Sequence, residues 1–153
     1  MKKLGLLFLA MVMLCACQKP ENATVKNTES KNTYVPKQSQ PTSPQLDKGV
    51  GPIKEVKLDP IDKKLAKTGK LIFEGKCMAC HKLDKRFSGP PLGGIAGKKT
   101  PEYIMNFILN PEGMTKDNLS GQALLEQYLT AMPNLQLKTD DARAILEYLR
   151  TTK

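Results

Sequence analysis

The residues Cys77-Met78-Ala79-Cys80-His81 limit what this chain can fold into more than any other stretch of its sequence. Two thiols lie three residues apart, and the only histidine of the chain follows the second thiol directly. Three chemistries use such residues: a structural zinc site, a redox-active dithiol and the covalent attachment of haem. The rest of the sequence has to decide among them, because each makes a different demand on its surroundings.

Residues 1–17 have the features of an export signal and are not expected to fold with the rest of the chain. Lys2 and Lys3 form a short positive region, and residues 4–14 form an apolar run. A bilayer span needs about 20 residues, so this run is typical of an export signal rather than of a transmembrane helix. The mature protein is therefore expected outside the cytoplasm.

The end of this signal, Leu14-Cys15-Ala16-Cys17, resembles a bacterial lipobox. The resemblance implies that Cys17 is the lipidated residue. Acylation of Cys15 and simple cleavage of the signal are the alternatives. Because each buried methylene group contributes roughly 0.8 kcal/mol, acyl chains on Cys17 would anchor the protein at the periplasmic face or the cell surface without a spanning helix.

Residues 18–58 are predicted to form a disordered polar linker. They are rich in Asn, Thr, Ser, Gln, Lys and Pro, so they cannot bury enough apolar surface to offset the entropy lost on ordering. A flexible chain of this length has a root-mean-square reach of roughly 35 Å. We expect the linker to let the folded part move away from the membrane.

The charge of the chain is moderately basic. Removal of residues 1–17 takes away Lys2 and Lys3, which lowers the formal net charge from +9 to +7. Such a surface suits acidic protein partners or anionic surfaces. No nucleic-acid partner is expected, because the chain has no Trp and no motif that combines aromatic stacking with basic residues.

Residues 59–153 are predicted to form one small all-α domain of about four helices. Apolar residues recur at helical spacing, and no segment shows convincing strand alternation. The expected helices are 60–75 after an Asp59 cap, one from Thr100-Pro101 to Asn110-Pro111, one over 119–130, and one capped by Thr139-Asp140-Asp141. The loops are rich in Gly and Pro and aromatic residues are few, so the core is thin. Such domains often depend on a metal, a disulfide or a cofactor.

Zinc and dithiol chemistry fit this domain poorly. Structural zinc needs four Cys or His ligands, and none remains after Cys77, Cys80 and His81. A thioredoxin-like dithiol follows a strand, whereas here a helix is expected before the motif. C-x-x-C-H is the attachment signature of c-type haem, and an exported chain suits it. We therefore predict one covalent haem c on Cys77 and Cys80, with His81 as an axial ligand.

The second axial position calls for a soft ligand, because the domain has no other histidine or spare thiol. Three methionines are candidates. Met105 lies on an expected helix, where core packing is the ordinary role. Met114 in a polar loop is an alternative, and Met132, followed by Pro133 just past a helix, is preferred.

With these residues in place, residues 59–153 resemble a single-haem class I cytochrome c. Gly69 and Phe73 are similar to the contact pair on the first helix of that family. The resemblance implies that this pair crosses the last helix at Tyr148, with Ile145 alongside. It also implies a small cytochrome c-like fold in which Gly- and Pro-rich loops surround one haem.

Two loops carry the rest of the resemblance. Gly89-Pro90-Pro91-Leu92 is similar to the G-P-x-L element of the family, which implies that the Pro90 carbonyl accepts the proton on the far nitrogen of His81. Met132 with its following proline is similar to the distal loop, which implies ligation of the iron by Met132. The long polar leader and the lack of Trp depart from the family pattern.

The resemblance implies an electron carrier rather than an enzyme, cycling Fe(III) and Fe(II) in an extracytoplasmic respiratory chain. The basic residues that flank the expected haem loops either form a rim for acidic redox partners or are simply solvated; they are Lys82, Lys85, Arg86, Lys98 and Lys99. A labile sixth ligand would instead indicate a gas sensor or a weak peroxidase. A relay domain within a larger oxidoreductase complex is a further alternative.

Overall fold

The computed structural model describes residues 46–153, which form a helical domain. Its elements are α1 (Lys63–Lys76), the 3-10 helix η1 (Ile95–Gly97), α2 (Pro101–Leu109), α3 (Pro111–Asp117), α4 (Leu119–Tyr128) and α5 (Thr139–Arg150). No strand occurs among these residues, which confirms the all-α prediction. Within the same part of the chain no helix has the length and apolar character of a membrane span. The expected signal and Cys17 lie outside the described residues.

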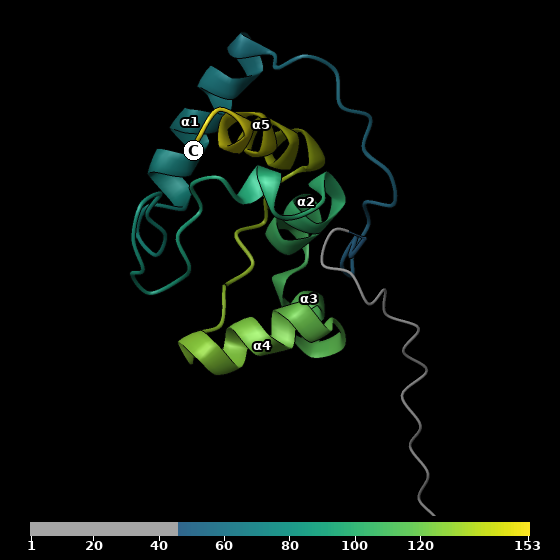
Figure 1. Cartoon of the computed structure of the whole chain (residues 1–153), viewed down its shortest axis with the longest axis vertical. Coiled ribbons are helices and arrows are strands. Elements are labelled where there is room, and N and C mark those ends of the chain that lie inside the picture. The colour runs from purple at the N-terminus through teal and green to yellow at the C-terminus, as the bar shows by residue number, and fades with distance from the viewer. Residues whose placement is uncertain (1–45) are drawn as a thin grey trace, which may run out of the picture. The chain divides into compact units, whose positions relative to one another are not determined.

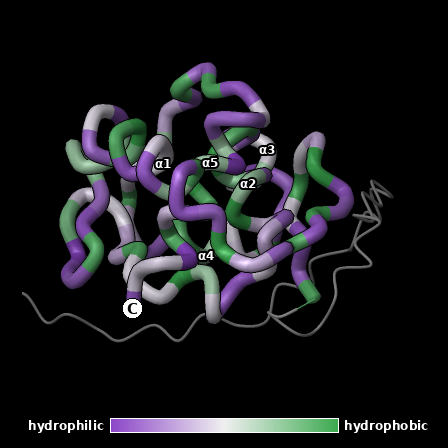
Figure 2. The backbone as a smooth tube through the Cα atoms, turned by 90° about the horizontal axis from the view of Figure 1, so that it is seen from above, coloured by the Kyte–Doolittle hydropathy of each residue, from purple (hydrophilic) through white to green (hydrophobic). Residues whose placement is uncertain are grey.

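Helices α1 and α5 cross and form the main core (Figure 1). Phe73 of α1 is 2% exposed, and its ring centroid lies 5.3 Å from that of Tyr148 on α5. Gly69 lies against the backbone of Ala144, so the helices approach at a residue without a side chain. The predicted contact of Gly69 and Phe73 with the last helix is thus confirmed. Hydrophobic and hydrophilic residues alternate in short stretches along the chain, as amphipathic helices require (Figure 2).

One of the predicted helix starts is wrong. Helix α1 begins at Lys63, and the side chain of Asp62, not Asp59, accepts hydrogen bonds from the N–H groups of Lys64 and Leu65. Helix α5 begins at Thr139, within the predicted capping group, and the Asp141 carboxylate accepts from the backbone N–H of Lys138 at 3.0 Å. Each helix begins where a carboxylate reaches free backbone N–H groups.

The prediction missed one helix, α3. Asn110-Pro111 ends α2 as expected, but it also begins α3, because the Asn110 side chain accepts from the N–H of Gly113 at 3.2 Å and Pro111 occupies the first helical position. Asn118 then caps α4 through the N–H of Gly121 at 2.9 Å. The chain from α2 to α4 is therefore a series of short helices that share capping residues.

Residues 47–59, which we call the N-terminal strap, are ordered against the helices, although 18–58 was expected to be a disordered linker. The Asn106 side chain donates to the carbonyls of Lys48 and Ile53 and accepts from the Ile53 N–H, all at 2.9 Å. The Glu102 carboxylate accepts from the N–H of Val56 at 2.9 Å. These side chains on α2 replace the backbone partners that an extended segment lacks, which explains how a segment without periodicity is ordered.

The end of the strap is held on α5 by two arginines, which a buried carboxylate of the same helix aligns. Glu147 is 1% exposed and pairs with Arg143 at 3.0 Å and Arg150 at 2.8 Å. The two guanidinium groups also donate to the carbonyls of Lys57 and Asp59, at 3.2 and 2.9 Å. One acid on α5 thus aligns two arginines that hold the strap.

The α1–α5 crossing gives a stability prediction for two glycines of α1. In Gly69→Ala the new Cβ would overlap the carbonyl of Ala144, so the helices must separate and the free energy of unfolding should fall by about 1–3 kcal/mol. Gly75 has open space around its Cβ position, so Gly75→Ala should raise it by up to about 1 kcal/mol. Denaturant unfolding of the haem-loaded protein measures both. Equal effects of the two substitutions would contradict the close approach of the helices.

Candidate functional site

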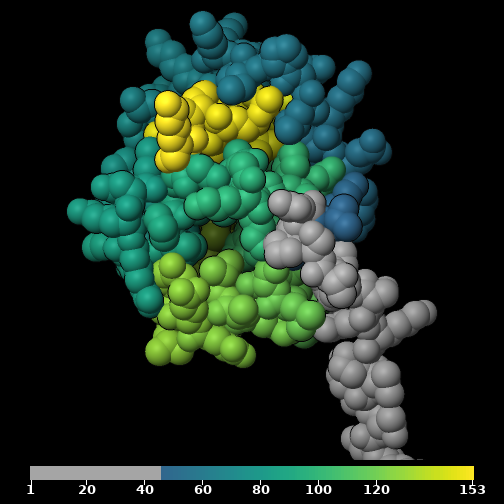
Figure 3. All heavy atoms as spheres, in the orientation of Figure 1, coloured from purple at the N-terminus to yellow at the C-terminus, as the bar shows by residue number. Residues whose placement is uncertain are grey.

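A cavity of about 430 Å³ lies between the loop after α1, helix α2, helix α4 and the loop that joins α4 to α5. The space-filling view shows a hollow between the teal segment that follows α1 and the light-green helix α4 (Figure 3). Its lining is mostly apolar, and its volume lies in the range of about 300–1,000 Å³ that is usual for small-molecule sites. This cavity brings together most of the residues predicted for the site.

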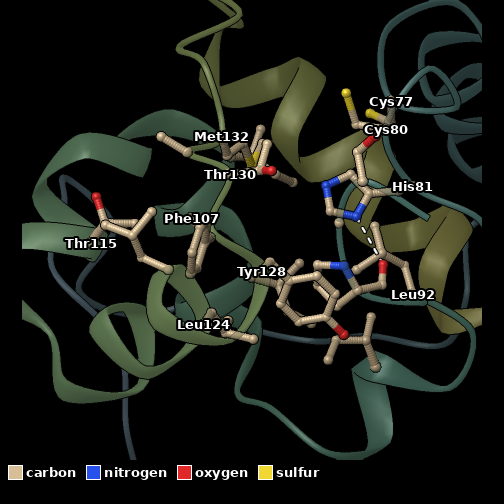
Figure 4. A pocket seen from close by; sticks show the side chains of 18 of the residues that line it. Cys77, Cys80, His81, Leu92, Phe107, Thr115, Leu124, Tyr128, Thr130 and Met132 are labelled. Carbon is tan, nitrogen blue, oxygen red and sulfur yellow. Dashed lines mark hydrogen bonds between the residues drawn. The ribbon is translucent and has the colours of Figure 1, made fainter. Parts of the chain in front are cut away.

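The two thiols and the imidazole lie at one wall of the cavity, directly after α1 (Figure 4). The last turn of α1 continues into the motif, because the N–H of Cys77 donates to Phe73 O at 2.8 Å and that of His81 donates to Cys77 O at 2.9 Å. Both cysteines are free thiols. Burial, with a contribution from Cys80, raises the pKa of Cys77 to about 11, so this thiol is protonated at neutral pH when nothing is attached to it.

The His81 ring is held in one orientation from two sides. Its Nδ1 lies 2.9 Å from the carbonyl oxygen of Pro90. A carbonyl only accepts, so Nδ1 carries the proton and the lone pair of Nε2 is left for a metal. Gly89 lies so close to the ring that a Cβ there would come within 2.8 Å of Nδ1. The local chain therefore fixes both the tautomer and the tilt of the imidazole.

Among the described residues, Met132 is the one methionine that lines the cavity. Its side chain extends into the cavity from the α4–α5 loop, and His81 extends from the other wall (Figure 4). Met105 is 3% exposed and belongs to the α1–α5 core. Met114 is fully buried, and its sulfur accepts from the N–H of Val50 at 3.0 Å. Only Met132 is thus placed to act together with His81.

The loop that carries Met132 is bounded by two residues with left-handed backbone. Leu129 has φ 51° and Gln136 has φ 54°, a conformation that is unfavourable for residues with a Cβ. The Asn134 side chain accepts from the N–H of Gln136 at 2.8 Å, which closes a turn inside the loop. A left-handed backbone at such residues costs free energy, and it is kept only where the surrounding structure holds the chain in that conformation.

One corner of the cavity is polar. Lys99, Tyr103 and Ser120 line it, and the Tyr103 hydroxyl is buried without a hydrogen-bond partner in the described chain. Burial and the nearby Asp47 carboxylate both raise the pKa of Tyr103, although Ser120 opposes the shift. Because buried hydroxyl groups are nearly always paired, this one is available to a ligand. We refer to these three residues as the polar corner.

Haem fits this set of groups. Two thiols and an imidazole at one wall, a thioether opposite, apolar surfaces between them and a polar corner with an unpartnered donor suit a flat, apolar macrocycle with acidic substituents. A zinc site does not fit, since the described residues contain no group of three or more His, Cys, Asp or Glu side chains able to hold a metal.

The five basic residues expected at the rim are not all simply solvated. Arg86 donates to the Gln127 carbonyl at 2.9 Å, and its guanidinium carbon lies 4.3 Å from the centroid of the Tyr128 ring. These contacts join the loop after His81 to the end of α4. Lys82 and Lys99 lie over the rings of Phe87 and Tyr103, at 5.1 and 4.4 Å, whereas Lys85 and Lys98 are exposed.

Sequence reasoning missed the polar corner. Lys99 was expected only at the rim, and neither Tyr103 nor Ser120 was expected to line the site. The strap was missed too, and one signal could have indicated it. Glu102 and Asn106 of α2 and Asn110 directly after it recur every four residues, and all three bind strap backbone. A polar stripe on a largely buried helix needs partners, and a neighbouring loop is the usual source.

Comparison with known proteins agrees with this site. The family model for cytochrome c matches residues 66–153. The chain is similar to cytochrome c2 iso-1 of Magnetospirillum fulvum (32% identity; 51% of this chain and 92% of that protein) and to cytochrome c2 of Rhodopseudomonas palustris strain ATCC BAA-98 / CGA009 (26%; 58% and 81%). Among solved structures it resembles cytochrome c from Rhodothermus marinus, with 46% identity, a TM-score of 0.64, and 65% of this chain and 87% of that chain covered.

The family match covers more than half of the chain and includes the C-x-x-C-H motif, which identifies the cofactor as one covalent haem c and the activity as electron transfer without an enzymatic reaction. The chain therefore belongs to the cytochrome c family, as a class I member.

Proposed function

We propose that this protein is a membrane-tethered electron carrier of an extracytoplasmic respiratory chain, with the haem attached to Cys77 and Cys80 and the iron ligated by His81 and Met132. The observation that carries the proposal is the placement of Met132 across the cavity from His81. Two strong ligands leave no open position for a substrate, so a carrier is favoured over a catalyst.

Haem c, when bound, supplies a one-electron Fe(III)/Fe(II) couple. The chain's residues determine which state is favoured. The Pro90 carbonyl accepts a hydrogen bond from the Nδ1–H of His81 and thereby makes Nε2 a stronger electron-pair donor to the iron. The neutral thioether of Met132 and the apolar lining favour the reduced state, because both disfavour the extra charge of the oxidised one.

A sensor or weak peroxidase is less well supported. Both functions need a labile sixth ligand, and peroxidase chemistry also needs an acid or base near the open position. The cavity lining contains no carboxylate and no second histidine. A relay domain in a larger oxidoreductase complex would use the same two iron ligands as a free carrier.

The tether is part of the proposal. Residues 1–17 would act as the signal and Cys17 would carry the lipid, as the lipobox-like stretch indicates. Because the strap binds the domain from residue 47 onward, we assign residues 18–46 to the flexible linker, which gives a reach of roughly 30 Å. The exposed amines of Lys85 and Lys98 then suit weak, salt-sensitive docking of acidic redox partners.

Replacement of the proposed sixth ligand tests the carrier function. Met132→Ala should remove the sulfur-to-iron absorption band near the red edge of the visible spectrum and lower the reduction potential. It should also let imidazole or carbon monoxide bind at once. Met105→Leu is the matched control, since it keeps the volume of a buried methionine outside the cavity. A wild-type protein that already lacks the band and binds carbon monoxide would support the sensor instead.

Replacement of Cys17 tests the tether. Cys17→Ser should move the protein from the membrane fraction to the soluble extracytoplasmic fraction and remove the acyl mass, while the haem spectrum stays unchanged. Cys15→Ser is the control and should leave the protein on the membrane. If Cys15→Ser releases the protein and Cys17→Ser does not, the acceptor is Cys15; if neither does, lipidation is not the anchor.

A further inference from the structure

The N-terminal strap lies outside the stretch that the cytochrome c family model matches, yet it reaches the haem site. The match begins at residue 66, and the strap ends at residue 59. The first strap residue, Asp47, is 5% exposed, which is unusual for an acid. A strap residue that precedes the matched stretch is therefore buried beside a residue of the cavity.

The carboxylate of Asp47 accepts three hydrogen bonds. Its Oδ1 accepts from the side-chain amide of Asn118 and from the N–H of Gly49, both at 2.8 Å, and its Oδ2 accepts from the hydroxyl of Ser120 at 3.0 Å. The Asp47 carbonyl accepts from the hydroxyl of Thr100 at 2.7 Å. A carboxyl group that only accepts has the bonding pattern of the ionised form.

This negative charge has no ion-pair partner within the described residues. Lys48, its neighbour, pairs with Glu102 at 3.5 Å instead. The amine of Lys99 reaches the Ser120 hydroxyl at 3.4 Å, so Ser120 separates the two charges. The groups that donate directly to Asp47 are neutral, and because the carboxylate is buried, solvent ions screen its charge little.

The surroundings of Asp47 include the polar corner of the cavity. Ser120 bonds Asp47 directly and lines the cavity, and Thr100 caps the helix that carries Tyr103. One side chain thus separates the carboxylate from the cavity that would hold the haem. The oxidised haem iron carries one more positive charge than the reduced one, so a buried anion beside this cavity stabilises the oxidised state.

We propose that Asp47 is a positioning residue for the polar corner and that its buried charge lowers the reduction potential of the haem. The strap is then a part of the redox site and not an extension of the linker. This inference rests on the proposed electron-carrier function, since it concerns the potential of the same haem.

The test compares two neutralised acids of the strap in the full-length, haem-loaded protein. Asp47→Asn should shift the midpoint potential to a more positive value in a spectroelectrochemical titration. Glu55→Gln removes the same charge from an exposed position of the same strap and should shift it much less. The shift for Asp47→Asn should persist in high salt, because buried charges are screened little. Equal shifts, or a negative shift for Asp47→Asn, would overturn the proposal.

Unfolding measurements on the ferric and the ferrous protein distinguish an effect of the Asp47 charge from a merely structural effect of this residue. Asp47→Asn should destabilise the ferric protein more than the ferrous protein, whereas loss of packing alone would destabilise both equally and contradict the proposal. Asp47→Glu keeps the charge and should stay closer to the wild-type potential than Asp47→Asn does. The wild-type absorption band of the sulfur ligand reports on the carrier function separately, so failure of that function is distinguishable from failure of this inference.

Discussion

The described fold is arranged around a cavity that side chains alone do not fill. Behind it lies a small core in which Phe73, Ile145 and Leu149 of two crossing helices are almost fully buried. On its other side, α3 contacts both α2 and α4, and Gly121 is the one residue of α4 that is buried. A haem attached at the end of α1 would give these helices a common surface to pack on, which is how a domain with so few large residues becomes stable.

The same geometry controls the chemistry. The turn that places the thiols also begins the loop in which Gly89 and the Pro90 carbonyl fix His81. The strap adds a second level of control, since residues before the matched stretch bind α2 and α5 through Glu102, Asn106 and Arg143. Both levels use directional hydrogen bonds between polar groups, which specify one arrangement where an apolar contact would allow several.

Local sequence signals predicted the capped start of α2 at Thr100, and the resemblance to the G-P-x-L element implied the contact of His81 with the Pro90 carbonyl. Each depends on residues close together in the chain. Met132, the preferred candidate for the sixth ligand, lines the cavity, whereas Met114 does not. The strap and the polar corner were not predictable in this way. Asp47 and Ser120 lie 73 residues apart and meet only in the folded chain, and a segment without periodicity gives no sign of order until its partners are known.

The account's central claim is that the haem completes the interior of this domain. The most direct measurement is thermal or denaturant unfolding, followed by near-ultraviolet circular dichroism, of the haem-loaded protein and of a Cys77→Ala, Cys80→Ala chain made without haem. The account predicts a cooperative transition and fixed aromatic signals for the loaded protein and neither for the haem-free chain. A haem-free chain that unfolds cooperatively with native-like aromatic signals would contradict it.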